Sequence, residues 1–226
     1  MIERLDWDSE FFGIEVGKIV DSPFSDVMNI NQFDFLYVFN GKESDTGAPN
    51  FLKSYEGFHR VYQKMDLTFQ EVVFPEVHSA RNLDFNLDDL YTLAFISGSQ
   101  SRYNRDAQIP SGNFKLLYKT WIDNSLNKTF AEDVLLYIEN KKIEGFITYK
   151  NHNKYSKIGL FAVNAGKQGK GIGKKLLKTV ENKLAILNIS ELRIPTQQEN
   201  KQACAFYEKM GYKLNDTYLV QHFWKV

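Results

Sequence analysis

The feature that most constrains this chain is an apolar strand-like run that leads into a glycine-rich turn and then into a helix. Residues 158–163 are almost continuously apolar, and residues 168–173 read Gln-Gly-Lys-Gly-Ile-Gly. From Ile172 onward apolar residues recur at helical spacing, with lysines opposite. Glycines let consecutive backbone N–H groups turn toward one anion, and a helix N-terminus adds partial positive charge. The segment therefore predicts a phosphate-binding strand–loop–helix unit.

The spacing within this loop excludes two common phosphate-binding motifs. A P-loop needs a glycine five residues before Gly173 and a hydroxyl two residues after it, but the chain has Gln168 and Lys175 there. The dinucleotide fingerprint needs a third glycine where Lys174 stands, and an acid about twenty residues on, where Arg193 stands. Nucleoside triphosphates and redox dinucleotides are therefore disfavoured.

Two segments together resemble the GNAT superfamily of acetyl-CoA-dependent N-acetyltransferases. The first matches the family's cofactor signature, with alanine in place of the proline often seen at position 165, and the second matches an element of the family's following helix. The matched residues are Val163, Gln168, Gly169, Gly171 and Gly173, then Asn200, Ala203, Phe206, Tyr207, Gly211 and Tyr212. The resemblance extends from about residue 87 to the end and implies acetyl-CoA as cosubstrate.

The resemblance also implies roles for individual residues. The backbone of the strand would bind pantetheine and polarise the thioester carbonyl, and Tyr207 would protonate the leaving thiolate as general acid. Packing beside Phe206 is the alternative role for Tyr207. Lys167 would assist with the phosphates, whereas Lys175 and Lys178 would lie on a solvated helix face. The expected cofactor-binding residues are Phe161, Ala162, Val163, Gln168, Gly169, Lys170, Gly171, Ile172, Gly173, Lys174, Asn200 and Tyr207.

Two of the remaining side chains in this region have simpler expected roles. Asn200 contacts the cofactor or caps the helix that follows it, and the two roles are compatible. Cys204 lies between two alanines, which is typical of small buried packing, so no catalytic role is expected for it.

The periodicity along the chain predicts an α/β (α+β) protein with two domains. Residues 1–84 are expected to form a small α/β domain on the acceptor side, and residues 85–226 a GNAT domain with a central mixed, mostly antiparallel sheet flanked by helices. The junction lies within residues 71–86. In the first domain we expect strands at 14–20, 33–39 and 58–69 and a helix near 50–55.

In the second domain a helix at 87–96, with Asn86 as its N-cap, precedes a functional loop at 97–112 and a second helix at 114–125. A hairpin of strands at 133–138 and 145–149 follows. After the glycine loop and its helix, strand and helix alternate, with a strand at 191–196, a helix after Asn200 and a final strand that ends near Trp224.

The acceptor must be inferred from the parts of the chain outside the cofactor motifs. Residues 5–14, 101–106 and 117–122 resemble the dTDP-fucosamine acetyltransferase type of GNAT enzyme, which implies the 4-amino group of a nucleotide-linked 4,6-dideoxyhexose. Arginines beside a tyrosine suit a diphosphate and a stacking surface. A surface loop, and contacts that join the two domains through Asp6, Trp7, Asp8 and Phe12, are the alternatives. The expected acceptor-binding residues are Arg102, Tyr103, Arg105 and His222.

Other acceptors and a different class of protein also remain open. A protein N-terminus, a polyamine or an antibiotic amine would favour an acidic groove, whereas the nominated loop is basic. A non-catalytic acetyl-CoA sensor would have no need of Tyr207. No residue is an obvious general base, and a water relayed by a carboxylate would serve.

Composition limits the partners and the location. The 28 Lys and Arg balance the 28 Asp and Glu, so no global field favours nucleic acid or a membrane surface. No stretch approaches the roughly 20 apolar residues of a spanning helix, and the acidic start is unlike a signal peptide. One cysteine and four unclustered histidines predict no metal site. We expect a cytoplasmic enzyme for a small-molecule amine; a homodimer is compatible with the sequence.

Overall fold

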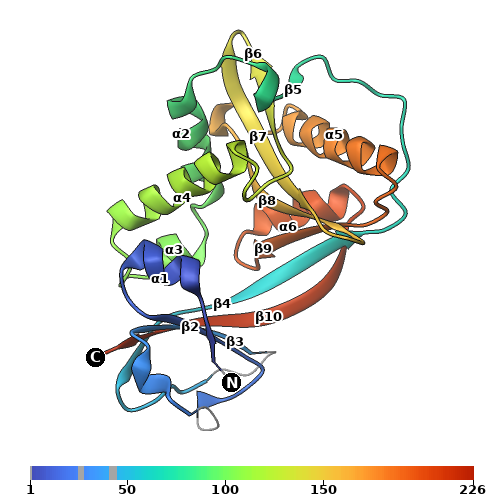
Figure 1. Cartoon of the computed structure of the whole chain (residues 1–226). Helices are drawn as coiled ribbons and strands as arrows, with labels where there is room; N and C mark the ends of the chain where they lie inside the picture. Colours follow the sequence, from blue (N-terminus) through green and yellow to red (C-terminus); the bar gives the residue numbers. More distant parts are fainter. Residues whose placement is uncertain (1, 25–27, 41–44) are drawn as a thin grey trace.

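A computed structural model describes residues 2–24, 28–40 and 45–226 of the chain. In this part, ten strands form one sheet in the order β1-β2-β3-β10-β4-β9-β8-β7-β6-β5 (Figure 1). The β2–β3 and β8–β9 pairs are parallel and the other pairs are antiparallel. The strands are β1 (Glu3–Arg4), β2 (Val16–Val20), β3 (Phe35–Asn40), β4 (Phe51–Lys64), β5 (Val77–Ser79), β6 (Asp133–Glu139), β7 (Lys142–Asn151), β8 (Ser156–Val163), β9 (Leu192–Gln197) and β10 (Lys213–Lys225).

Helices flank this sheet on both faces (Figure 1). Helices α2 and α4 pack against β6, β7 and β8 on one face, and α5 packs against the same strands from the other face. The described helices are α1 (Asp6–Phe12), α2 (Leu87–Ser97), α3 (Arg102–Arg105), α4 (Ser111–Leu126), α5 (Ile172–Ile186) and α6 (Lys201–Lys209). The predicted fold class, a mixed and mostly antiparallel sheet between helices, is confirmed.

The N-terminal and C-terminal parts of the chain interleave in the sheet. Strand β4 lies between β9 and β10, and β10 in turn lies between β4 and β3. Near the chain start, Trp7 stacks on Phe11 and meets Phe130 edge to face at 5.6 Å between ring centroids. Contacts of this kind join residues 1–84 to residues 85–226. That these two segments form separate domains stays a prediction.

One predicted element is wrong. The helix expected near 50–55 is the start of β4, in which Phe51 and Tyr55 are buried while Lys53 is exposed. The segment pairs with the end of β10, where Trp224 stands opposite Leu52. Because strand propensity depends on such partners, pairing with a strand at the far end of the chain overrides the local pattern.

Several boundaries also differ from those predicted. The loop expected at 97–112 contains the short helix α3 and the start of α4. Helix α1, β1 and β5 were not predicted, and all three are seven residues or shorter. The N-cap predicted for α2 is confirmed, because Asn86 Oδ1 accepts a hydrogen bond from the Asp88 N–H at 3.0 Å.

Strands β8 and β9 separate after a short stretch of pairing. They pair in parallel at Ser156 with Leu192 and at Lys157 with Arg193, and within the described structure their remaining residues are not paired with each other. On its other side β8 has an irregularity against β7, where the Leu160 N–H donates to Thr148 Oγ1 at 2.8 Å. The second half of β8 therefore has a backbone edge that faces away from β7 and is free of β9.

Candidate active site

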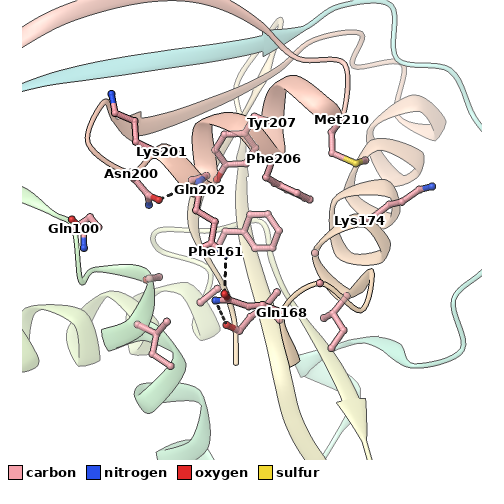
Figure 2. A pocket seen from close by; sticks show the side chains of 18 of the residues that line it. Gln100, Phe161, Gln168, Lys174, Asn200, Lys201, Gln202, Phe206, Tyr207 and Met210 are labelled. Carbon is pink, nitrogen blue, oxygen red and sulfur yellow. Dashed lines mark hydrogen bonds between the residues drawn. The ribbon is translucent and has the colours of Figure 1, made fainter. Parts of the chain in front are cut away.

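A cavity of about 670 Å³ opens beside this edge of β8. It is bounded by the end of β8, the start of α5, helix α6 and the end of α2 with the loop after it (Figure 2). The structure therefore brings eleven of the twelve predicted cofactor-binding residues together, and Lys170 is the exception. The eleven are Phe161, Ala162, Val163, Gln168, Gly169, Gly171, Ile172, Gly173, Lys174, Asn200 and Tyr207.

The glycine loop owes its shape to two left-handed residues. Gly169 has φ +77° and Gly171 has φ +82°, a region that side chains with a Cβ rarely adopt. Gly171 is the N-cap of α5, and the first helical backbone bond runs from the Lys175 N–H to the Gly171 carbonyl at 3.0 Å. The N–H groups of the first helical turn therefore have no partner within the helix. They lie at the cavity wall, where an anion would satisfy them.

Gln168 connects the loop to its neighbours. Its Nε2 donates to the Val163 carbonyl at 3.3 Å, and its Oε1 accepts from Gln202 Nε2 at 2.8 Å (Figure 2). The side chain thus joins the end of β8 to the first turn of α6. This arrangement holds the glycine loop beside α6 rather than leaving it as an independent turn.

The lysines around the loop fall into two groups. Lys174 lines the cavity and is exposed, as is Lys170 in the loop, and neither forms an ion pair with a described residue. Lys167 also lines the cavity but contacts two carboxylates, which are Glu139 and, at 3.6 Å, Glu144. Of these three lysines, Lys174 and Lys170 are therefore the two whose charge is not neutralised by an ion pair within the described residues.

Two lysines of α5 depart from the expected solvated face. Lys175 pairs with Glu76 at 2.7 Å and Lys178 pairs with Glu181 at 2.6 Å. Neither lines the cavity. Both are therefore held in ion pairs rather than lying on a free, solvated surface.

Tyr207 extends from α6 among aromatic rings at the cavity wall (Figure 2). Its ring centroid lies 5.8 Å from that of Tyr62 and 6.5 Å from that of Phe161. Burial raises the pKa of Tyr207 above its ordinary value of 10, so the hydroxyl stays protonated at neutral pH. It forms no hydrogen bond with any described residue, and it is therefore available as a donor.

Asn200 and Cys204 also lie in α6 or at its start. Asn200 Oδ1 accepts a hydrogen bond from the Ala203 N–H at 3.1 Å, which confirms the predicted helix cap, and Asn200 lines the cavity as well. Cys204 is buried, and its Sγ lies 3.7 Å from the Gln197 carbonyl and outside the cavity lining. These contacts agree with a packing role for the thiol.

The predicted acceptor residues do not line the cavity but gather next to it. The guanidinium carbon of Arg102 lies 4.1 Å from the ring centroid of Tyr37 and 4.6 Å from that of Tyr103. Arg102 Nη1 is buried and has no hydrogen-bond partner among the described residues. Arg105 Nη1 lies 3.7 Å from Glu199 Oε2, and Glu199 lines the cavity. The two groups of residues are thus neighbours.

His222 lies in the same neighbourhood, in the interior of the sheet. It is fully buried, and its Nδ1 lies 2.6 Å from Oδ2 of Asp106, a carboxylate that also accepts from Trp224 Nε1 at 3.1 Å. Burial lowers the pKa of His222 to about 4, so the ring is neutral and donates through Nδ1. His222 thus contacts, through Asp106, the end of residues 101–106, which consist of α3 and its two caps and are called the α3 segment below. The sequence analysis had given Asp106 no role.

Within residues 2–24, 28–40 and 45–226 there is no group of three His, Cys, Asp or Glu side chains arranged to hold a metal ion. Among the same residues no helix has the length and apolar character needed to cross a membrane.

The fold and the cavity define a structural class, a mixed sheet whose parallel strands β8 and β9 separate beside a glycine-rich helix N-terminus, with a cavity at that point. The model of the Acetyltransferase (GNAT) family matches residues 94–212, which is more than half of the chain. The chain therefore belongs to the GNAT acetyltransferase family. It is an acetyl-CoA-dependent N-acetyltransferase, and the match includes the glycine loop and Tyr207.

Individual relatives are similar to most of the chain. Over 211 residues the chain is 23% identical to the spore coat polysaccharide biosynthesis protein SpsD of Bacillus subtilis, covering 92% of this chain and 72% of SpsD. A conserved protein of unknown function from Staphylococcus epidermidis has a similar structure, with TM-score 0.60, 16% identity and coverage of 94% of this chain and 85% of that one. A GNAT-family acetyltransferase of Colwellia psychrerythraea gives TM-score 0.52 at 15% identity, covering 86% and 66%. These two structures support the fold.

Proposed function

We propose that acetyl-CoA binds in the cavity with its phosphates at the N-terminus of α5. The observation that carries this proposal is the pair of left-handed glycines, Gly169 and Gly171, which present unpaired N–H groups to the cavity wall. Lys174, exposed and without an ion pair in the described structure, adds positive charge. The free edge of β8 supports binding of the pantetheine amides in the manner of an added strand.

The chain's own groups then suit acyl transfer. Backbone N–H groups near Phe161 would polarise the thioester carbonyl and meet the oxyanion that forms on it. The Tyr207 hydroxyl, protonated because burial raises its pKa, would donate a proton to the departing sulfur. Asn200, which caps α6 at the cavity wall, has its amide nitrogen available for a carbonyl of the pantetheine arm.

For the acceptor, the proposed substrate is the 4-amino group of a nucleotide-linked 4,6-dideoxy sugar. The main support is Arg102, whose guanidinium lies against Tyr37 and Tyr103 and forms no ion pair with a described carboxylate. A cation held between aromatic rings suits a diphosphate and its nucleoside. SpsD, whose name refers to polysaccharide biosynthesis, is similar over almost the whole chain and adds support.

Direct contact of His222 with the acceptor has less support than contact of Arg102. It is fully buried and lies outside the cavity lining, so acceptor contact would require the α3 segment to move. Its proposed contribution is indirect, because the bond to Asp106 fixes the end of that segment. We also propose that the enzyme is cytoplasmic, because its single cysteine is a buried free thiol, which agrees with a reducing compartment.

The test is a panel of dTDP-, UDP- and GDP-linked amino sugars incubated with the protein and acetyl-CoA. The proposal predicts a mass gain of one acetyl group on a 4-amino-4,6-dideoxy sugar, and loss of that gain in the Arg102→Gln variant. Acetylation of a polyamine or an aminoglycoside in place of every nucleotide sugar would contradict the proposed substrate. A protein that consumes no thioester with any amine would be a sensor and not an enzyme.

A further inference from the structure

The charges around the cavity are unevenly distributed. Four of its lining side chains are lysines, and Glu199 is the one carboxylate among the lining residues of the described structure. Sequence reasoning had found no base for the acceptor amine and had not considered Glu199. The lysines suit the phosphates of the donor, whereas an amine that enters as an ammonium needs an acid. The cavity offers one such group.

Glu199 lines the cavity next to the short helix α3. It follows β9 and directly precedes the cap of α6, and its carboxylate lies 3.7 Å from Arg105 of α3. Its charge also acts on Tyr55 of β4, whose pKa is raised to about 12 by burial first and by Glu199 next. These contacts put the carboxylate beside the α3 segment and β4, on the proposed acceptor side.

The position of Glu199 relative to Tyr207 suits acid–base chemistry on one reacting centre. The two residues are eight apart along α6 and its cap, which corresponds to roughly 12 Å between their Cα atoms at 1.5 Å per residue. Helical side chains such as that of Tyr207 point back toward the helix N-terminus, which shortens the separation of the functional groups. Both groups line the same cavity. The space left between the Glu199 carboxylate and the Tyr207 hydroxyl suits a carbonyl carbon together with its attacking nitrogen and its leaving sulfur.

We propose that Glu199 is the catalytic carboxylate that binds the acceptor ammonium and removes one of its protons, directly or through one water. The free amine attacks the thioester carbonyl carbon, which forms the C–N bond and a tetrahedral oxyanion, and the C–S bond breaks when this intermediate collapses. Tyr207 gives its proton to the sulfur, and the second proton lost from the nitrogen restores the hydroxyl. The first proton leaves Glu199 for solvent, so the products are an acetamide, free thiol and one proton. This inference rests on the proposed placement of donor and acceptor in this cavity.

The experiment compares four single variants of the full chain, one of which is the conservative change Glu199→Asp. Glu199→Gln removes the carboxylate, Arg105→Gln removes its ion-pair partner but leaves the carboxylate, and Glu132→Gln makes the same chemical change at an exposed side chain far from the cavity lining. The readouts are kcat/KM for the amine from pH 6 to 10 and acetyl-CoA affinity by calorimetry. The amines are dTDP-4-amino-4,6-dideoxyglucose and, separately, ethanolamine in large excess.

The proposal predicts that Glu199→Gln lowers kcat/KM roughly 100-fold at neutral pH, within the usual range for loss of a general base. The deficit should shrink as pH rises and more amine is free, while acetyl-CoA affinity is unchanged. Glu132→Gln should keep full activity, and Glu199→Asp should recover part of it. Arg105→Gln removes an expected acceptor-binding residue, so it should raise KM for the nucleotide sugar while the pH profile stays that of wild type. Should Glu199→Gln fail to fold, Glu199→Asp and Arg105→Gln still separate a chemical role from a positioning role.

Four results would overturn the proposal or separate it from the proposed substrate. Wild-type kcat/KM in Glu199→Gln removes the carboxylate from the mechanism. An equal loss in Arg105→Gln, with no change in the pH profile, assigns Glu199 to positioning the α3 segment. Acetylation of ethanolamine but of no nucleotide sugar contradicts the proposed substrate and leaves the Glu199 comparison valid with ethanolamine. Acetylation of neither amine by wild-type protein overturns both.

Discussion

Replacing Gly171 by alanine tests the loop that carries the cofactor proposal. Gly171 has φ +82°, and a Cβ built on it would meet nothing within 4 Å, so the substitution introduces backbone strain without a steric clash. For an L-residue with a side chain this conformation costs about 1–2 kcal/mol. If the protein keeps the loop, the free energy of unfolding falls by that amount, which lowers Tm by roughly 2–8 °C in a domain of this size.

If the loop relaxes instead, the strain appears in binding. The N–H groups at the start of α5 then leave the geometry that an anion requires, and 1–2 kcal/mol corresponds to an affinity for acetyl-CoA that is about 5- to 30-fold lower. The assays are thermal unfolding without ligand and calorimetric titration with acetyl-CoA. The two losses together should sum to about 1–2 kcal/mol.

Gly112→Ala is the matched control. Gly112 lies in the first turn of α4, and its added Cβ also meets nothing within 4 Å, but it does not have a positive φ. Alanine there is expected to be neutral or to stabilise the helix by up to about 1 kcal/mol, with no effect on acetyl-CoA. A Gly171→Ala protein with wild-type Tm and wild-type acetyl-CoA affinity would refute the reasoning.

Three other predictions follow from the site and its surroundings. Tyr207→Phe should lower turnover about 100-fold or more while acetyl-CoA affinity hardly changes, and unchanged turnover would remove Tyr207 from the mechanism. Lys174→Ala should weaken acetyl-CoA binding about 2- to 5-fold at low salt and less at high salt. Lys175 lies outside the cavity lining, so Lys175→Ala should leave acetyl-CoA binding unaltered. Equal effects of the two substitutions would contradict the assignment of Lys174 to the phosphates. Burial lowers the pKa values of His59 and His222 to about 3 and about 4 from an ordinary 6.5. As pH falls, the unfolded chain therefore takes up protons before the folded protein does. The contribution of these two histidines to the free energy of unfolding should be constant above about pH 6.5 and should decrease as pH drops toward 4. If the free energy of unfolding of His222→Gln depends on pH as steeply as that of wild type, the result would argue against this.

Most of the residues that the sequence nominated for the donor line one cavity, because local chemistry determines the shape of the segments that carry them. Glycine is needed at positions 169 and 171 because the backbone is left-handed there, and Asn200 caps α6, the helix that begins at the next residue. Such requirements involve only nearby residues. The spacing of Gln168 and the glycines was therefore enough to predict a strand, a glycine loop and a helix in succession, which the structure contains.

The features that were missed depend on contacts between distant parts of the chain. Residues 50–55 form a strand because β10 lies beside them, more than 150 positions later. The role proposed for Glu199 depends on the other charged residues around the cavity, and the role of Asp106 depends on its hydrogen bonds with His222 and Trp224. Local periodicity carries no information about such pairings. The one available signal was the position of Glu199 directly before the motif residue Asn200.

The central claim is that acetyl-CoA occupies this cavity, with phosphates at the start of α5 and the thioester near Tyr207. The most direct measurement is a crystal structure of the protein with acetyl-CoA. The account predicts pyrophosphate oxygens within hydrogen-bonding distance of the N–H groups at residues 171–174, and the thioester sulfur within reach of the Tyr207 hydroxyl. Acetyl-CoA bound elsewhere, or bound here with its sulfur directed away from α6, would contradict it.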